Sequence, residues 1–234
     1  MTTRKLDLAG LTTRIVEPSS RPTSPDVAST VVLLHGFGAP GEDLVSLAEV
    51  IDAPVRWVFP EAPLELGGMY GDARAWWLLD LARLEDELRR GAPRDRRDEV
   101  PDGLVAARDH VTRLIDQLVA RYPTPRLVLG GFSQGAMLAL DVALHREIAP
   151  SGLILMSGTL LAASVWEPRL PKLAGVPMLM SHGRSDTLLP FGIAEVLRDK
   201  LRAAGAVVDW HEFAGGHEIP MAVLAAATKF LARN

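Results

Sequence analysis

The sequence has no cysteine among its 234 residues, which excludes disulfide bonds, thiolate metal ligands and a cysteine nucleophile. It also has no long apolar run. No segment approaches the roughly 18 consecutive apolar residues of a membrane-spanning helix. The N-terminus, Met1 to Lys5, leads into Leu6-Asp7-Leu8 without the continuous apolar stretch that is typical of a secretory signal. We therefore expect a cytoplasmic protein without stable membrane insertion.

Positive charge is not in excess either. Lysine and arginine total 25 against 29 aspartates and glutamates, for a net charge of −4, which argues against nucleic acid as a partner. The phosphate-binding pattern G-x-x-x-x-G-K-[ST] and the zinc-binding pattern H-E-x-x-H do not occur, and Glu218 is the only carboxylate beside a candidate histidine. We therefore expect no metal site. The length and the 48% hydrophobic content fit a single domain over residues 1–234.

Short apolar segments alternate with longer amphipathic ones along the chain. This alternation predicts an α/β fold with a mostly parallel central sheet and helices on both faces. Residues 17–29 are interpreted as a polar, proline-rich connection, 83–99 as a solvated face of mixed charge, and 157–172 as a loop. The expected strands are 6–16 (or a hairpin), 30–34, 55–59, the run from 127, 152–156, 176–181 and 207–213, and the expected helices are 42–51, 78–90, 103–122, 136–146, 191–204 and 221–231.

The segment Gly131-Phe132-Ser133-Gln134-Gly135 matches the pattern G-x-S-x-G. In this motif the serine occupies a sharp turn between a strand and a helix, where its hydroxyl is exposed above the sheet. The N-terminus of the following helix favours negative charge that develops there. The pentapeptide alone is weak evidence, but an apolar run precedes it and a helical pattern follows it. Ser133 is therefore a candidate nucleophile.

A serine hydroxyl needs a base, usually a histidine that is oriented by a carboxylate. Of the six histidines, His217 alone lies in a glycine turn after the last expected strand, whereas His35 and His182 each precede a glycine at a strand end and are interpreted as structural. Asp186 follows a strand by a short loop. The order Ser133, Asp186, His217 is the chain order of the α/β-hydrolase triad, and the carboxyl ends of parallel strands share one edge.

A nucleophilic serine of this kind also needs two hydrogen-bond donors for the oxyanion. One is the backbone N–H of Gln134, which follows the nucleophile, and the other comes from the loop after an early central strand. Here that loop is His35-Gly36-Phe37-Gly38, so Phe37 is the second candidate donor.

The same loop supports an alternative interpretation. Gly36, Gly38 and Gly41 form a G-x-G-x-x-G pattern between a strand and a helix, and Glu61 lies 20 residues beyond Gly41. This pattern is typical of dinucleotide-binding proteins, and it predicts a nicotinamide cofactor. Pro40 within the turn and Pro60 before Glu61 argue against it, and it gives the three residues of the triad no role.

The motifs resemble those of the small carboxylesterase/acyl-protein thioesterase branch of the α/β-hydrolases, the phospholipase/carboxylesterase family. The matching segments span residues 31 to 219 and comprise Leu34-His35-Gly36-Phe37-Gly38, Phe59-Pro60-Glu61-Ala62-Pro63, Ala75-Trp76-Trp77, Gly130-Gly131-Phe132-Ser133-Gln134-Gly135, His182-Gly183 with Asp186 and Pro190, and Gly216-His217-Glu218-Ile219. The resemblance implies an α/β-hydrolase fold without a large lid domain. It implies ester or thioester hydrolysis without a cofactor, with Ser133 as nucleophile, His217 as base and then acid, and Asp186 orienting His217.

The resemblance also suggests which residues contact substrate. Trp76 and Trp77 are candidates for the pocket, although at least one of them is expected in the core. Further candidate walls are Met69, Leu160, Leu161 and Ile219. The expected substrate is a short-to-medium acyl carboxylic ester. The alternatives are an acyl-protein thioester, a small thioester or a lysophospholipid with the same triad, and a binding protein on an inactive hydrolase scaffold. The expected assembly is a monomer or homodimer.

Overall fold

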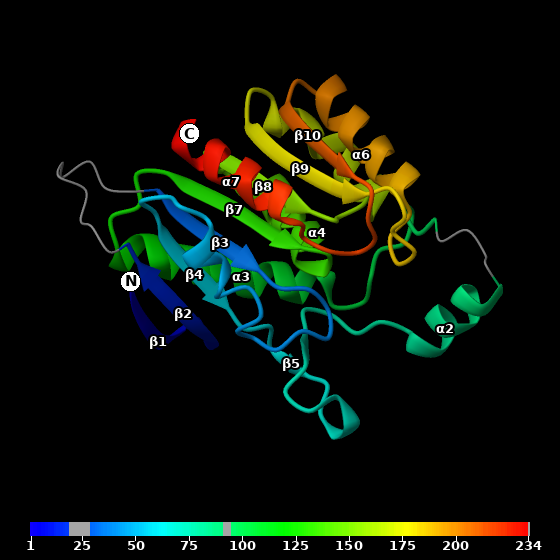
Figure 1. Cartoon of the computed structure of the whole chain (residues 1–234), viewed down its shortest axis with the longest axis horizontal. Coiled ribbons are helices and arrows are strands. Elements are labelled where there is room, and N and C mark those ends of the chain that lie inside the picture. The colour runs from blue at the N-terminus through cyan, green and yellow to red at the C-terminus, as the bar shows by residue number, and fades with distance from the viewer. Residues whose placement is uncertain (19–28, 91–94, 234) are drawn as a thin grey trace.

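The central feature of the computed structural model, which describes residues 1–18, 29–90 and 95–233, is one twisted sheet (Figure 1). Its strands follow the order β1-β2-β4-β3-β7-β8-β9-β10. All neighbours from β4 to β10 pair in parallel, and β1 and β2 add an antiparallel hairpin at one edge, so the mostly parallel sheet is confirmed. The strands are β1 (Thr2–Leu8), β2 (Leu11–Glu17), β3 (Thr30–Leu34), β4 (Arg56–Pro60), β7 (Leu127–Phe132), β8 (Gly152–Met156), β9 (Pro177–Gly183) and β10 (Val207–Phe213).

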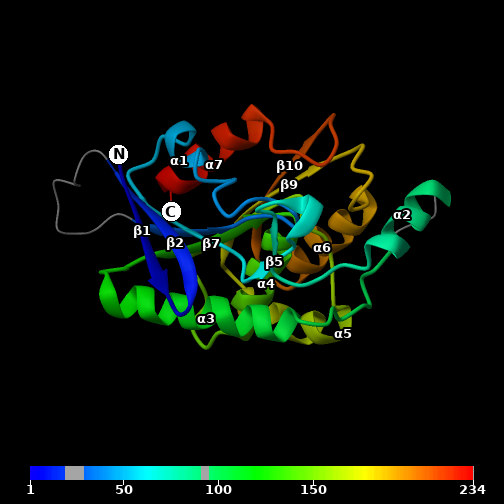
Figure 2. The same ribbon diagram turned by 90° about the horizontal axis from the view of Figure 1, so that it is seen from below.

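Helices cover both faces of the sheet (Figure 2). One face packs against α3 (Leu104–Arg121), α4 (Gln134–His145) and α6 (Phe191–Ala203), and the other packs against α1 (Leu47–Val50) and α7 (Met221–Arg233). The buried side chains of α3 recur every three or four positions, as an amphipathic helix requires: Leu104, Ala107, Val111, Leu114, Ile115 and Leu118. The central strands β3 and β8 are buried at every position, because helices cover them on both sides.

Two sequence predictions about local structure were wrong. The helix expected over 42–51 is reduced to α1, because the chain before it turns through i→i+3 hydrogen bonds such as Asp43 N–H to the Pro40 carbonyl. The loop expected over 157–172 contains α5 (Ala163–Trp166) and the 3-10 helix η2 (Glu167–Leu173). Prolines at 168 and 171 prevent a continuous α-helix there, while the buried Trp166 and Leu170 hold the segment against the core.

Two segments of the chain between β4 and α3 project from the sheet. A small hairpin of β5 (Leu64–Glu65) and β6 (Arg74–Ala75) encloses the 3-10 turn η1 (Gly68–Tyr70) and was not expected from the sequence. Beyond it, α2 (Leu81–Arg90) stands on an arm away from the sheet (Figure 1). The described residues contain no separate lid domain.

Parts of two predicted polar segments lie outside the described residues. These are positions 19–28 of the proline-rich connection and positions 91–94 of the mixed-charge face. Within the described ranges, no helix has the length and apolar character needed to cross a bilayer. The cytoplasmic location and the monomeric or dimeric state stay predictions.

Candidate active site

Ser133 lies at the junction of β7 and α4, in a backbone conformation that side chains rarely adopt. Its φ of 56° and ψ of −119° place it in a strained region, and its N–H is held by the Met156 carbonyl of β8 at 2.9 Å. The flanking glycines permit this turn for a steric reason. A Cβ on Gly131 would lie 2.6 Å from the Gly135 carbonyl oxygen, and a Cβ on Gly135 would lie 2.6 Å from the His35 carbonyl oxygen. The motif therefore forms a strand–turn–helix elbow.

His217 and Asp186 are brought together from the loops after β10 and β9. His217 Nδ1 lies 2.7 Å from Asp186 Oδ2, and Asp186 Oδ1 accepts the N–H groups of Leu188 and Leu189 at 2.9 Å each. Burial would raise the pKa of the Asp186 carboxyl, but the hydrogen bonds from His217 and Leu189 outweigh it and hold that pKa below its ordinary value. The ionised carboxylate requires a hydrogen on Nδ1, which leaves Nε2 of His217 as the proton acceptor.

A cavity of about 500 Å³ contains both Ser133 and His217 in its walls. Of the residues predicted from sequence, it is also lined by Phe37, Gln134, Trp77, Leu160 and Leu161. Asp186 lies behind His217, as an orienting group should. Trp76 and Ile219 do not line the cavity: Trp76 is buried with its indole N–H on the His35 carbonyl, and Ile219 packs against the core under α7. The side chain of Met69 lies outside what the structure describes.

Gln134 and the loop after β3, which the sequence predicts as the two sources of oxyanion donors, both line the cavity. The N–H of Gln134 belongs to the first turn of α4, where backbone donors have no partner within the helix. In the loop, the Gly38 N–H is taken by the Arg74 carbonyl at 2.9 Å, whereas the Phe37 N–H has no backbone acceptor in the described part of the chain. His35 supports this loop from below, because its Nε2 accepts the Ala62 N–H at 3.0 Å.

The side chain of Gln134 forms two hydrogen bonds that were not predicted from the sequence. Its amide oxygen accepts the Trp76 N–H and its amide nitrogen donates to the Trp77 carbonyl, both at 2.9 Å. These two bonds fix residues 76 and 77 against the elbow helix. Both indoles are buried in the core, but Trp77 also contributes to the cavity wall whereas Trp76 does not.

The dinucleotide interpretation does not agree with the structure. The Glu61 carboxylate is paired with Arg14, and with Arg74 at 3.4 Å, so it is not available to bind a ribose. Glu61 also occupies the space above Gly41, where an added Cβ would lie 2.6 Å from its Cδ. No helix begins at Gly41, because α1 starts only at Leu47. The loop therefore lacks the helix N-terminus that a pyrophosphate requires.

A buried polar cluster behind the site was also missed by sequence reasoning. Asp141 of α4 is fully buried and accepts hydrogen bonds from Arg108 Nε of α3 at 2.6 Å and Trp166 Nε1 of α5 at 2.8 Å. It therefore ties three helices together at the far end of the elbow helix. The available signal was a single acid within the apolar helix 136–144, which a buried partner would explain.

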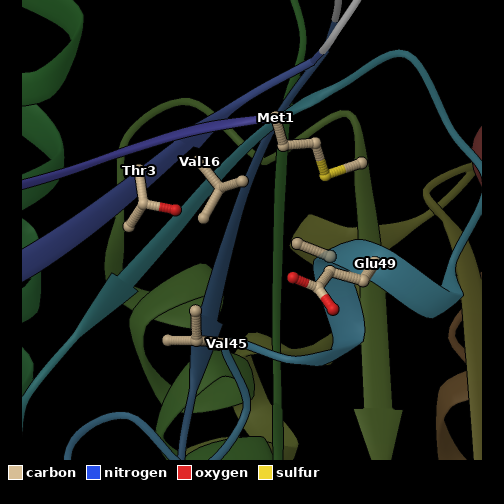
Figure 3. A pocket seen from close by; sticks show the side chains of 6 residues that line it. Met1, Thr3, Val16, Val45 and Glu49 are labelled. Atoms are coloured by element: carbon tan, nitrogen blue, oxygen red, sulfur yellow. The ribbon is translucent and has the colours of Figure 1, made fainter.

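A second cavity, of about 370 Å³, lies beside the N-terminus and α1 (Figure 3). It is at the β1–β2 edge of the sheet, whereas Ser133 follows the central strand β7. It is lined by Met1, Thr3, Val16, Val45, Ala48 and Glu49. It brings together one hydroxyl and one carboxylate but no imidazole. Ser133 and His217, with Asp186 in contact with His217, are thus found at the first cavity.

Comparisons with known proteins agree with the geometry. The model of the family described as Phospholipase/Carboxylesterase matches residues 13–234. Among curated relatives, acyl-protein thioesterase 1 of Neurospora crassa is 27% identical over 215 residues, covering 87% of this chain and 85% of that protein. A probable carboxylesterase of Oryza sativa subsp. japonica is 28% identical over 219 residues, covering 90% and 79%. The crystal structure of esterase PE8 superposes with a TM-score of 0.76 at 28% identity, covering 95% of this chain and 98% of that one.

Proposed function

The chain belongs to the phospholipase/carboxylesterase family of α/β-hydrolases, and on that premise we propose that it is a serine carboxylesterase acting on short-to-medium acyl esters. The observation that carries the proposal is the 2.7 Å contact between His217 Nδ1 and the buried Asp186 Oδ2, with His217 and Ser133 in the wall of one cavity. A binding role alone would not require a nucleophile, a base and an orienting acid in this arrangement.

The reaction follows from the placement of these groups. His217 Nε2 takes the proton of Ser133 Oγ as the oxygen attacks the ester carbonyl, and Asp186 stabilises the imidazolium that forms. The N–H groups of Phe37 and Gln134 stabilise the oxyanion. The tetrahedral intermediate collapses when His217 returns the proton to the leaving alcohol oxygen, which gives an acyl-serine. Water then attacks this ester with His217 again as base, and His217 passes the proton to Ser133 Oγ as the bond between Oγ and the acyl carbon breaks and the carboxylic acid leaves.

The cavity supports acyl chains of limited length. Its apolar wall includes Trp77, Met137, Leu160 and Leu161. A volume of about 500 Å³ lies within the range of small-molecule sites. A thioesterase activity with the same triad is the second candidate, and it is favoured by the relatives that carry the name acyl-protein thioesterase. Rates on matched butyryl oxygen and sulfur esters distinguish the two activities.

Covalent labelling is the direct test of the proposal. A fluorophosphonate should add its phosphoryl group to Ser133 and block hydrolysis of p-nitrophenyl butyrate. Trypsin releases this serine in the peptide of residues 127–146, where Ser133 is the only serine, so mass spectrometry locates the adduct. The proposal fails if turnover of the acetyl, butyryl, octanoyl and palmitoyl esters is absent, or if the label is found elsewhere while the activity is lost.

Activity should fall on acidification, because a protonated His217 cannot accept the serine proton. The loss should be reversible. Asp186 has a lowered pKa in the folded state, so its contribution to stability persists above about 3.9, its unfolded pKa, and is lost only as the pH falls further, through the folded value. A pH profile of kcat/KM alongside thermal unfolding checks this; a flat profile would exclude His217 as the base.

Leu161→Trp should shorten the range of accepted acyl chains, since Leu161 forms part of the apolar wall and is 7% exposed. We expect kcat/KM for the octanoyl ester to fall about 10-fold or more relative to the acetyl ester, because apolar-pocket contacts discriminate by roughly this factor. Val119→Trp, on the exposed face of α3, introduces the same indole away from the site and should leave the ratio unchanged. An unchanged ratio in Leu161→Trp would place the acyl chain elsewhere.

A further inference from the structure

His182 is a second imidazole in contact with the acid of the triad. It lies next to the end of β9, four residues before Asp186, and its side chain is fully buried. Its Nε2 lies 2.8 Å from the Leu189 carbonyl oxygen and 3.3 Å from Asp186 Oδ2. Both neighbours of Nε2 are acceptors, so Nε2 carries the hydrogen. Nδ1 is buried without a hydrogen bond among the described atoms, and the Gly158 backbone acts on the ring more weakly than Leu189 does.

The backbone of Leu189 forms hydrogen bonds with both His182 and Asp186. The Leu189 N–H donates to Asp186 Oδ1, while the Leu189 carbonyl accepts from His182 Nε2. The ring of His182 therefore fixes the short loop that supplies two backbone N–H groups to the carboxylate. Leu188 and Leu189 of this loop also line the cavity. Asp186 Oδ2 thus faces two rings, His217 at 2.7 Å and His182 at 3.3 Å.

We propose that His182 is a positioning residue for the hydrolysis, which holds the loop of Asp186 in place and takes up part of the negative charge on Oδ2, so that it tunes the basicity of His217. The inference rests on the proposed function of the triad. Burial lowers the pKa of His182, although the Leu189 carbonyl and the Asp186 charge oppose the shift. The ring is therefore neutral, and it presents the positive end of one N–H dipole to Asp186.

The sign of the effect follows from the surroundings. The titratable groups that face Asp186 are His182 and His217, while Phe191 of α6 packs on the His182 ring and Phe132 of β7 on the His217 ring. Of the other charged groups in this region, Arg184 is paired with Glu212 and lies over Phe191, and the Glu218 carboxylate lies beside Gly215. Removing the His182 N–H leaves more negative charge on Oδ2. The protonated form of His217 is then favoured, and more alkaline conditions are needed for activity.

The test compares three variants in the full chain. His182→Leu removes the N–H and should move the acidic limb of the kcat/KM profile for p-nitrophenyl butyrate upward by about half a pH unit. It should also lower the plateau about 10-fold, through a loosened Asp186 loop. His182→Gln retains an amide N–H near the position of Nε2. It should restore most of the wild-type plateau of kcat/KM and most of the wild-type position of the acidic limb. His110→Gln removes an imidazole that is bonded to Arg113 on α3, and it should match the wild type.

The outcomes separate this inference from the proposed function. An unshifted acidic limb in His182→Leu, with activity that still depends on Ser133, overturns the role of His182 alone. If His182→Leu loses activity without a shift of the acidic limb, and His182→Gln does not restore the activity, His182 contributes to stability only and the inference is overturned. If wild type shows no turnover that depends on Ser133, both proposals fall. Should His182→Leu not fold, ¹⁵N spectra of the wild-type imidazoles decide the question. They should show His182 neutral at about pH 7 with hydrogen on Nε2 only, and a charged or Nδ1-protonated ring there contradicts the inference.

Discussion

Ser133→Ala is expected to lower kcat for p-nitrophenyl butyrate by about 10⁶-fold, because the residues of a nucleophilic triad act as a unit. The substitution removes only Oγ. The Cβ and the strained backbone at φ 56° remain, so the elbow and the cavity should keep their shape. We therefore expect the free energy of unfolding to change by less than about 0.5 kcal/mol. Stopped-flow or steady-state release of p-nitrophenol, with thermal unfolding of the same preparation, measures both quantities.

Ser157→Ala is the matched control for this experiment. Ser157 follows β8 as Ser133 follows β7, it also has a positive φ of 50°, and it is fully buried. Its hydroxyl contacts the Glu218 carbonyl at 3.4 Å, beside the loop that carries His217. Its loss should therefore cost about 10-fold or less in kcat/KM, through a small displacement of that loop. Comparable rates for Ser133→Ala and wild type would contradict the assignment of Ser133 as nucleophile.

The residues proposed for the triad could be picked out because their positions depend on local patterns. Ser133, Asp186 and His217 each follow a parallel strand, and the carboxyl ends of these strands lie at one edge of the sheet. The glycines around Ser133 predicted the turn, and the chain order of the three residues suggested their roles. The structure places His217 and Asp186 in contact, while the roles themselves are for the experiments above to test.

Other parts of the site depend on contacts between distant segments, which periodicity does not report. The Gln134 side chain bonds to the backbone of Trp76 and Trp77, which lie 58 and 57 positions earlier in the sequence. The helix expected over 42–51 failed for a related reason. Its acidic first turn is a good local signal, but Pro40 bridges to Ala73 and Glu42 pairs with Arg14. These long-range contacts favour a succession of turns over a regular helix.

Gly135 belongs to the local G-x-S-x-G motif and also contacts the distant end of β3. Its φ is not in the left-handed region, so the backbone itself does not require glycine there. The requirement comes from the end of β3: a Cβ on Gly135 would lie 2.5 Å from the Leu34 carbonyl carbon and 2.6 Å from the His35 carbonyl oxygen. The first turn of α4 and the loop of Phe37 are thus in direct backbone contact. Both proposed oxyanion donors depend on that contact.

Gly135→Ala is accordingly expected to damage stability and activity together. The obstructing atoms belong to the backbone of β3, which is held in register with β7 through Leu34 and Gly131, so they cannot move aside as a flexible side chain would. Overpacking of this kind costs about 1–3 kcal/mol or more, and the helix preference of alanine, about 1 kcal/mol, offsets only part of it. Separation of the Gln134 and Phe37 N–H groups should lower kcat/KM at least about 100-fold in the protein that remains folded.

Gly192→Ala provides the matched control, since it makes the same substitution near the start of another helix, α6, where a Cβ would meet no atom within 4 Å. There alanine should leave activity unchanged and raise the free energy of unfolding by up to about 1 kcal/mol. Chemical denaturation and p-nitrophenyl butyrate hydrolysis, applied to both variants, compare the two effects directly. If Gly135→Ala were as stable and as active as Gly192→Ala, the close approach of α4 to β3 would not be what holds the two oxyanion donors in place.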